Sequence, residues 1–540
     1  MGWMSWTLGS ERKGAAASVE RLRWNSRRAV PCTVRLVSWA IAAAVAFGSS
    51  SVGADGQRYI TDERGRALIL HGLNVSGDAK WDPERMPWVE REDIKRMARA
   101  WGLNFARFLI TWDGIEDVQG VYDEAYLDRI AERLDWLDDY GIHVVLDMHQ
   151  DLYGPKDSDG RDFRGNGHPA WSMLTDGLFY QPSPIDWFLD YFTPAINRAF
   201  DNFWDHDGHP ELQDHYVAAW AHIAERFRNH PAVLGYDIMN EPFAGTLTAD
   251  VAAFDNGPYR EFLDRAIAAI RAVDPDGWIF FEARAWGPNS GEPSYIPVLD
   301  DPRAGEDRLA YFPHYYSLIV DASGQYLPEI DNSIESWALN RTLEAEAQGA
   351  PLLIGEWGTG ANVVNFDQYL ENVVRMADHT TSGWAYWSYD LGGWSPIDAD
   401  RNETPQAEIL IRAYPQRVAG DPLYVDFDPQ SRVLQLVFAE KPGASGPTEI
   451  YVPRRRFYPE GFGLEVSDRR GHWKAAWDPA REILSLCADP KAEEHTVVVR
   501  PRQKGERPCK HAARPPRGVK VRYGALECRG KRLVRGHPAR

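Results

Sequence analysis

The sequence predicts an α/β protein, a (β/α)8 TIM barrel followed by a C-terminal β-sandwich domain. Eight short, almost continuously apolar runs recur between residues 67 and 390, with helical periodicity between them. From about residue 416 the pattern changes to strands of alternating polarity, separated by proline and glycine turns. An open doubly wound sheet is the alternative for the first part, but no glycine-rich phosphate loop supports it.

The first 54 residues have the order of a secretory signal peptide. A basic stretch (21–35) precedes the apolar run "LVSWAIAAAVAF", and small residues lead to Ala54. We therefore expect residues 1–54 to be removed and the mature protein to be secreted, either extracellular or associated with the cell envelope. An N-terminal membrane anchor is the alternative, and the long basic region leaves open a start codon further downstream.

The barrel domain is expected over residues 55–415. Helical patterns such as 92–102 and 126–141 end near glycines, as helices between parallel strands commonly do. Eight strands with helical crossovers then close a barrel. In chain order, the predicted strands are 67–75, 105–112, 143–150, 233–242, 278–284, 309–316, 351–358 and 383–390.

Composition narrows the classes of ligand. A formal charge of −19 excludes nucleic acid as the main partner, because most of the surface would repel a phosphate backbone. The 22 tryptophans suit flat, weakly charged ligands such as sugars, although core packing must account for most of them. We expect a monomer.

Two predicted strands end in a glutamate. The fourth, "VLGYDIMNEP", ends with Asn240 and Glu241, and the seventh, "PLLIGEWG", ends with Glu356. In a (β/α)8 barrel the carboxyl ends of the strands meet one pocket, so these two side chains should face each other. A facing pair of carboxylates suits glycosidic cleavage, in which one protonates the leaving oxygen and the other meets the oxocarbenium-like carbon.

The motifs "NEP", "GEWG", "DMHQDLYG" and "PHYY" resemble glycoside hydrolase family 5, over about residues 58–415. The resemblance implies a retaining (β/α)8 enzyme with Glu241 as acid/base and Glu356 as nucleophile, about 5 Å apart. We expect the negative charge of Glu356 to keep Glu241 protonated. No metal or organic cofactor is expected. The implied sugar-binding residues are Arg107 and His149 at the sugar subsite, Asn240 at the 2-hydroxyl, His314, Tyr316 beside the nucleophile, and Trp387 as the stacking floor.

Within this family, "DMHQDLYG" and the later "AFDNFW" resemble the endoglycoceramidase-related branch, which releases an intact glycan from ceramide. The resemblance implies that Lys80 and Asp151 contact the glucose next to the lipid. One alternative is a β-glucosidase or endo-β-glucanase acting on soluble glucosides or glucans. Another is a non-catalytic barrel that binds glycans. Neither motif distinguishes a glucosyl from a galactosyl headgroup.

The connection between the third and fourth strands, residues 151–231, is far longer than a barrel loop needs and is rich in aromatic residues. These rings either wall an apolar groove for an acyl chain or form the core of the insertion itself. Trp187 is a weak candidate for a substrate contact.

The β-sandwich is expected over residues 416–500. It either orients the enzyme at a lipid surface or covers one side of the barrel. Residues 501–540, rich in arginine, lysine, proline and glycine, predict a basic disordered tail that could bind anionic polymers or lipid headgroups. Once the signal peptide is lost, Cys487, Cys509 and Cys528 remain, which allows at most one disulfide and one free thiol.

Overall fold

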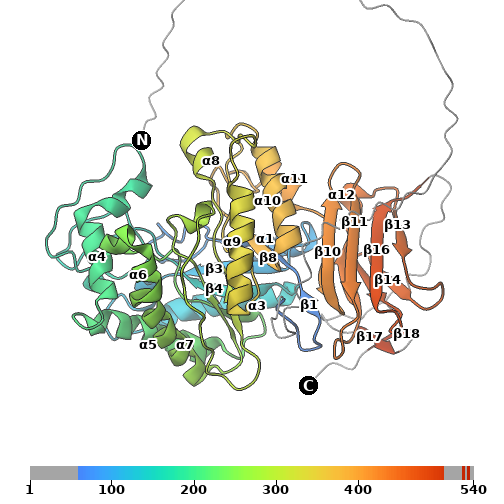
Figure 1. The fold of residues 1–540 in the computed structure, drawn as a ribbon, viewed down its shortest axis with the longest axis horizontal. Coiled ribbons are helices and arrows are strands. Elements are labelled where there is room, and N and C mark those ends of the chain that lie inside the picture. Colours follow the sequence, from blue (N-terminus) through green and yellow to red (C-terminus); the bar gives the residue numbers. More distant parts are fainter. Residues whose placement is uncertain (1–58, 504–525, 530–531, 536–540) are drawn as a thin grey trace, which may run out of the picture. The chain divides into compact units, whose positions relative to one another are not determined.

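The computed structural model describes residues 59–503, 526–529 and 532–535 (Figure 1). The predicted signal peptide and Cys509 lie outside these ranges. Among the described helices, none combines the length and the apolar character that a membrane crossing requires.

Seven labelled strands form one parallel sheet in the order β7-β6-β5-β4-β3-β2-β8, so chain order and spatial order agree from β2 to β7. All their residues are buried except His143, Val233 and Leu234, as expected for strands covered on both faces. The strands are β2 (Leu70–Val75), β3 (Phe105–Ile110), β4 (His143–Met148), β5 (Val233–Asp237), β6 (Trp278–Phe281), β7 (Leu309–Tyr311) and β8 (Gly383–Tyr386).

Residues 351–357 close the ring between β7 and β8. Parallel bridges join Leu352 to Tyr311 and Ile354 to Trp384. The Leu353 amide donates to the Tyr311 carbonyl at 2.9 Å, and the Ile354 amide donates to the Gly383 carbonyl at 3.0 Å. The predicted eight-stranded barrel is therefore confirmed, with this segment as its seventh strand.

The predicted first strand, 67–75, is two strands. β1 (Ala67–Leu68) lies outside the barrel sheet and pairs antiparallel with β9 (Tyr414–Val418) of the C-terminal sheet. Only β2 belongs to the barrel. Ile69 donates its amide to the Gln416 carbonyl, so the ladder with β9 continues past β1 before the chain turns into the barrel.

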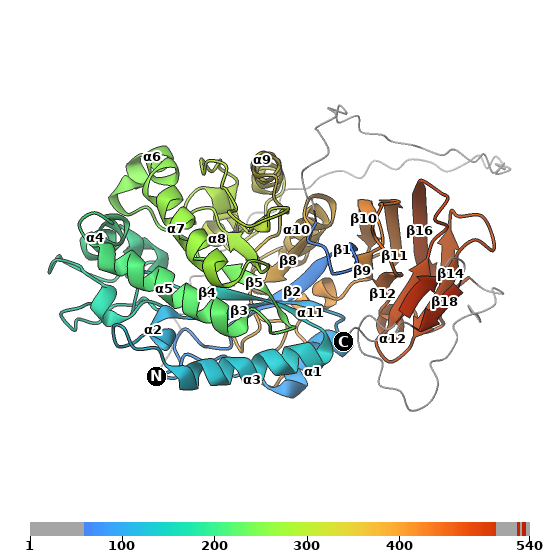
Figure 2. The same ribbon diagram turned by 90° about the horizontal axis from the view of Figure 1, so that it is seen from below.

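Amphipathic helices cover the outside of the sheet, as Figure 2 shows for α3, α5 and α7. In α3, Asp123 caps the first turn by accepting from the Tyr126 amide, and Gly141 ends the helix in the left-handed conformation. The helices are α1 (Arg91–Arg99), α2 (Trp112–Ile115), α3 (Glu124–Tyr140), α4 (Pro194–Trp204), α5 (Pro210–Phe227), α6 (Val251–Asn256), α7 (Pro258–Val273), α8 (Leu318–Ser323), α9 (Ser333–Gln348), α10 (Phe366–Thr380) and α11 (Pro405–Leu410), with 3-10 helices η1 (Ala170–Ser172), η2 (Trp187–Phe192), η3 (Gly245–Ala249) and η4 (Pro288–Ser290).

The C-terminal domain has two antiparallel sheets, which confirms the predicted β-sandwich class. One sheet has the order β1-β9-β12-β15-β14 and the other β10-β11-β16-β13. Its remaining elements are β10 (Asp421–Asp428), β11 (Val433–Ala439), β12 (Thr448–Tyr451), α12 (Arg454–Phe457), β13 (Phe462–Val466), β14 (Lys474–Asp478), β15 (Ile483–Cys487) and β16 (Glu494–Pro501).

The segment predicted to be a disordered tail contains an antiparallel hairpin, β17 (Leu526–Arg529) and β18 (Arg532–Arg535). Its sequence, "LECRGKRLVR", places apolar residues on both sides of a glycine, which is a hairpin pattern that the basic composition obscures. Cys487 is disulfide-bonded.

Candidate active site

Arg107, from β3, lies at the centre of a buried charge cluster at the carboxyl ends of the strands. Its guanidinium is fully buried and forms ion pairs of 2.6–2.9 Å with Asp147, Asp237, Glu282 and Glu356. Burial alone would lower the pKa of Arg107, but these four carboxylates raise it well above its usual value. The side chain is thus a fixed positive charge beneath the site.

Glu356 lies near the end of the closing segment of the barrel, residues 351–357. Its Oε1 accepts from Arg107 Nη1 at 2.6 Å, and its Oε2 accepts from the Tyr316 hydroxyl at 3.0 Å, as predicted for Tyr316. Burial favours the protonated form, but the positive charges of His314 and Arg107 outweigh it and lower the pKa of Glu356. The preceding Gly355 has no room for a side chain, since a Cβ there would lie 2.7 Å from the Phe312 carbonyl oxygen.

Glu241 follows β5 with φ of 44°, a left-handed conformation that costs a non-glycine residue free energy. Its amide donates to Glu282 Oε2 at 2.8 Å, which holds the backbone in place. Its own Oε1 accepts from Asn289 Nδ2 at 2.7 Å. Burial is the main cause that raises the pKa of Glu241, and the charges of Glu356 and Glu282 add to it. The predicted direction agrees, but the predicted main cause, Glu356, is secondary.

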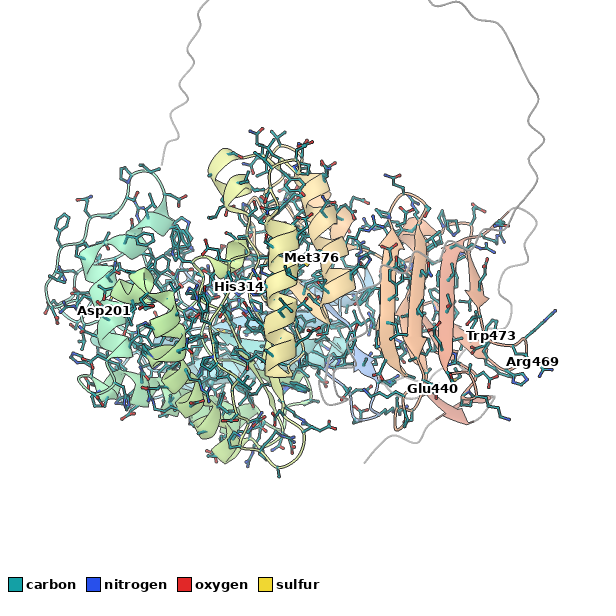
Figure 3. All side chains as sticks on the ribbon, in the orientation of Figure 1. Asp201, His314, Met376, Glu440, Arg469 and Trp473 are labelled. Atoms are coloured by element: carbon teal, nitrogen blue, oxygen red, sulfur yellow. The ribbon has the colours of Figure 1, made fainter. Side chains whose placement is uncertain are left out.

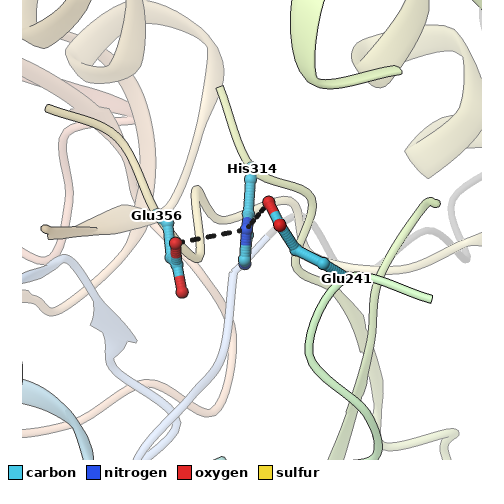
Figure 4. A group of neighbouring side chains, drawn as sticks. All are labelled: Glu241, His314 and Glu356. Carbon is cyan, nitrogen blue, oxygen red and sulfur yellow. Dashed lines mark hydrogen bonds and ion pairs between the residues drawn. The ribbon is translucent and has the colours of Figure 1, made fainter. Parts of the chain in front are cut away.

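His314 lies between the two glutamates (Figure 4). Its Nδ1 is 3.0 Å from Glu241 Oε1 and 3.5 Å from Glu356 Oε2, while its Nε2 is 3.1 Å from Glu282 Oε1. Burial would lower the pKa of His314, but Glu282 and Glu356 raise it well above the usual value. One donor atom from each of Glu241, His314 and Glu356 lies within 4.8 Å of the others. This carboxylate spacing is that of retaining glycosidases, not the wider gap of inverting ones.

A wall of polar and aromatic side chains continues outward from His149. Its ring stacks on Trp387 at 5.4 Å with an interplanar angle of 18°, and its Nδ1 lies 2.8 Å from Asp147 Oδ2. Lys80 Nζ lies 4.1 Å above the Trp387 ring and 2.7 Å from Asp151 Oδ2. Although burial opposes it, the Lys80 charge lowers the pKa of Asp151. Lys80, Asp151 and Trp387 therefore form one polar and aromatic wall.

This wall opens into a cleft of about 500 Å³. Trp187, from η2, and Trp81 reach it as well, so the aromatic insertion contributes to the cleft. The lining residues are Ser76, Asp78, Lys80, Trp81, Asp151, Arg164, Trp187, Trp387 and Asp390.

Asn240 is largely committed to the protein. Its Oδ1 accepts from Arg107 Nη2 at 2.9 Å, and its Nδ2 donates to the Gln150 carbonyl at 2.9 Å. One amide hydrogen remains for a ligand hydroxyl. The structure thus brings all ten predicted site residues into one contiguous site.

Two functional neighbours were absent from the sequence prediction. Glu282 ends the fifth barrel run, "WIFFEAR", in the same pattern that identified Glu241 and Glu356, and that signal was available. Asn289 lies in η4, within a long loop, where no local sequence pattern indicates a contact with Glu241.

Comparisons with known proteins cover nearly the whole described chain. Residues 61–392 match the model of the cellulase family, glycosyl hydrolase family 5, and residues 412–499 match that of the glycoside hydrolase family 5 C-terminal domain. Endoglycoceramidase I of Rhodococcus hoagii (strain 103S) is 29% identical over 474 residues, which cover 84% of this chain and 89% of that protein.

Solved structures agree with these matches. Endo-glycoceramidase II from Rhodococcus sp., in complex with ganglioside GM3, is 37% identical with a TM-score of 0.77, over 82% of this chain and 99% of that one. The same enzyme solved as a lactosyl-enzyme intermediate is 38% identical with a TM-score of 0.76, over 83% of this chain and all (100%) of the other.

Proposed function

This chain belongs to glycoside hydrolase family 5, a family of retaining glycosidases, and from that premise we propose that it cleaves the β-glycosidic bond between glycan and ceramide in glycosphingolipids. The observation that carries the proposal is the pair Glu241 and Glu356. Their carboxylates lie within 4.8 Å, and their pKa values are shifted in opposite directions. Such a pair supplies one acid and one nucleophile to a single bond.

In the first step, Glu356 attacks the anomeric carbon while Glu241 gives its proton to the glycosidic oxygen, so the ceramide leaves as a neutral alcohol. The new bond joins Glu356 to the sugar as an ester. Arg107 and the Tyr316 hydroxyl hold the attacking carboxylate in one orientation before the reaction.

In the second step, Glu241, now ionised, takes a proton from water. The resulting hydroxide attacks the anomeric carbon and releases Glu356, which restores the starting protonation states with retained configuration. His314 contacts both carboxylates and stays close to whichever one carries the charge.

The proposed substrate class rests on the polar and aromatic wall of Lys80, Asp151 and Trp387 and on the similarity to known enzymes. Lys80 and Asp151 offer a cation and a carboxylate side by side, which suits the hydroxyls of a sugar ring stacked on Trp387. The aromatic insertion brings Trp187 to the same cleft. The similarity to endoglycoceramidases over more than four-fifths of the chain favours ceramide as the aglycone.

The decisive experiment compares glucosyl-, galactosyl- and lactosylceramide in detergent with cellooligosaccharides. Mass spectrometry should detect free ceramide and an intact glycan, and the panel ranks the headgroups. The Glu356→Gln variant serves as the control for contaminating activity. Hydrolysis of cellooligosaccharides alone would reassign the enzyme to soluble glucans, and binding without hydrolysis would leave a glycan-binding barrel.

We further propose that the protein is secreted and acts as a monomer at a lipid surface. The basic and then apolar order of residues 21–47 supports export. N-terminal sequencing of the mature protein from its own host should find a start near Asp55. A mature chain that retains residues 1–54 would contradict the signal peptide and favour an anchor.

A further inference from the structure

The 3-10 helix η2 buries its carboxylate and exposes three of its large apolar side chains. In its sequence "WFLDYF", Asp190 is fully buried, whereas Trp187, Leu189 and Phe192 are 46%, 42% and 45% exposed. A segment of a soluble protein ordinarily buries its large apolar side chains and exposes its carboxylates. The arrangement therefore calls for a partner outside the chain.

This arrangement of η2 is held in place by the structure beneath it. Asp190 accepts from the Tyr180 hydroxyl at 2.8 Å and from the Ser183 amide at 2.6 Å. Phe188 stacks on Trp286 at 4.4 Å with an interplanar angle of 20°. Tyr191 is fully buried and accepts from the Leu152 amide at 3.0 Å. These contacts fix η2 as a rigid platform that presents its apolar side chains outward.

Neighbouring side chains extend this apolar surface. Ile185, two residues before η2, is 86% exposed, and Phe179 is 68% exposed. The Phe179 carbonyl accepts a hydrogen bond from the Ala195 amide. Phe179 therefore lies beside the start of α4, the helix that follows η2 in the chain. Figure 3 labels Asp201 on the same helix. We call Phe179, Ile185, Trp187, Leu189 and Phe192 the η2 patch.

The η2 patch is continuous with the active-site cleft. Trp187 belongs to both, and Trp81, which is 65% exposed, lines the same cleft. An object that covers the patch would therefore lie at the mouth of the cleft. Because the patch adjoins the cleft, its partner is more simply explained as a surface that contains the substrate than as a protein unrelated to the reaction.

The charge of the chain selects the kind of partner. With a formal charge of −19, the protein would be repelled by a strongly anionic surface. The nearby arginines do not offset this charge, since each is paired with a carboxylate: Arg161 with Asp157, Arg164 with Asp190 and Arg198 with Asp176. Exposed aromatic and aliphatic side chains favour the interface of a neutral bilayer.

We propose that the η2 patch inserts into the outer surface of a membrane of neutral, zwitterionic lipids and holds the cleft over it. The proposal rests on a membrane lipid being the substrate. Docking would let the enzyme draw a glycolipid headgroup into the cleft while the lipid chains remain near the bilayer.

The test uses the full-length enzyme and phosphatidylcholine vesicles that contain no glycolipid. The triple variant Phe179→Ser, Ile185→Ser, Leu189→Ser removes three patch residues that do not line the cleft. The matched control, Leu339→Ser, Leu343→Ser, Val364→Ser, removes three exposed aliphatic residues from other surfaces. Thermal unfolding establishes first that both variants fold.

In vesicle co-sedimentation, the patch variant should bind about 100-fold more weakly than wild type, because burying each such side chain strengthens binding by roughly an order of magnitude or less. The control variant should bind as wild type does. Hydrolysis of a soluble fluorogenic glycoside should be equal in all three proteins, whereas hydrolysis of vesicle-embedded glycolipid should fall in the patch variant alone.

Equal vesicle binding by wild type and the patch variant would overturn the proposal. A wild-type dimer in ultracentrifugation that the patch variant converts to a monomer would do so too, by assigning the patch to a second copy of the chain. Failure of the proposed function would look different: the wild type would still bind glycolipid-free vesicles through the patch, but ceramide would not be released from any headgroup.

Discussion

Replacing His314 with asparagine should move the whole pH profile of kcat/KM to higher pH. The Nδ1 atom faces both glutamates, and asparagine keeps a donor near that position while it removes the positive charge. That charge lowers the pKa of both Glu356 and Glu241. Activity requires Glu356 ionised and Glu241 protonated. Because both pKa values rise in the variant, the acidic and the alkaline limb should shift in the same direction.

The size of the shift follows from the distance. A unit charge 3.5 Å from Glu356 Oε2 is worth about 1 kcal/mol in water and about 5 kcal/mol at an effective dielectric constant of ~20. The smaller side chain admits water, so we expect the lower end of this range, which displaces the limbs of the measured profile by roughly one pH unit. The loss of the Nε2 contact with Glu282 leaves that carboxylate less neutralised, which raises the pKa of Glu241 further.

The assay is kcat/KM for a fluorogenic glycoside between about pH 4 and 10. A matched control is His495→Asn in the sandwich, because His495 is also fully buried against carboxylates, with Asp468 Oδ1 at 2.7 Å. Its limbs should stay at the wild-type positions. A His314→Asn profile with unmoved limbs, or with limbs that move apart, would refute the electrostatic argument.

Three further outcomes are expected. Tyr316→Phe should lower kcat/KM about 10- to 100-fold, since a hydrogen bond to a charged group contributes about 1.5–3 kcal/mol, and unchanged kinetics would separate Tyr316 from the nucleophile. Lys80→Met should raise KM for glucosyl substrates about tenfold by removing the cation that pairs with Asp151 at 2.7 Å, with little change in kcat; an unaltered KM would show that Lys80 makes no productive contact with the sugar. Glu241→Ala should slow natural substrates by about 10²–10⁴-fold, and added azide should restore turnover of activated glycosides as a β-glycosyl azide; an α product would contradict retention.

The fold was largely predictable because the barrel strands are buried on both faces. Their near-continuous apolar runs stand out in the sequence, and each ends where polar residues reach the pocket. Strand boundaries were less predictable, since they depend on pairing partners far along the chain. The split of the first run at Ile69 reflects β9, more than 300 residues later, which no local pattern near residue 69 indicates.

The site was predictable where a functional residue ends a strand. Glu241 and Glu356 follow this rule, and Glu282 follows it too although it was not chosen, whereas Arg107 lies inside β3 and was identified from the family resemblance. Residues that reach the site from loops carry no such signal, and Asn289 is the clearest case. The exposed side of η2 was not predictable either. Its sequence left open whether the aromatic residues wall a groove or form the core of the insertion, and the exposure of Trp187 and Phe192 above a buried Asp190 is visible only in the structure.

The charge cluster also explains how one carboxylic acid can serve as acid and then as base. Before the reaction, Glu241 is buried and faces the ionised Glu356, and both features raise the pKa of Glu241. Formation of the glycosyl ester removes the Glu356 charge. Glu241 is then the only one of the two catalytic carboxyl groups that can still ionise. The positive charge of His314, 3.0 Å away, favours the ionised form of Glu241. The pKa of Glu241 must therefore fall at the step where it has to accept a proton from water. A trapped glycosyl-enzyme, formed with a slow fluorinated substrate, should show this fall by carbon NMR of labelled Glu241; an unchanged pKa would leave the second step without its base.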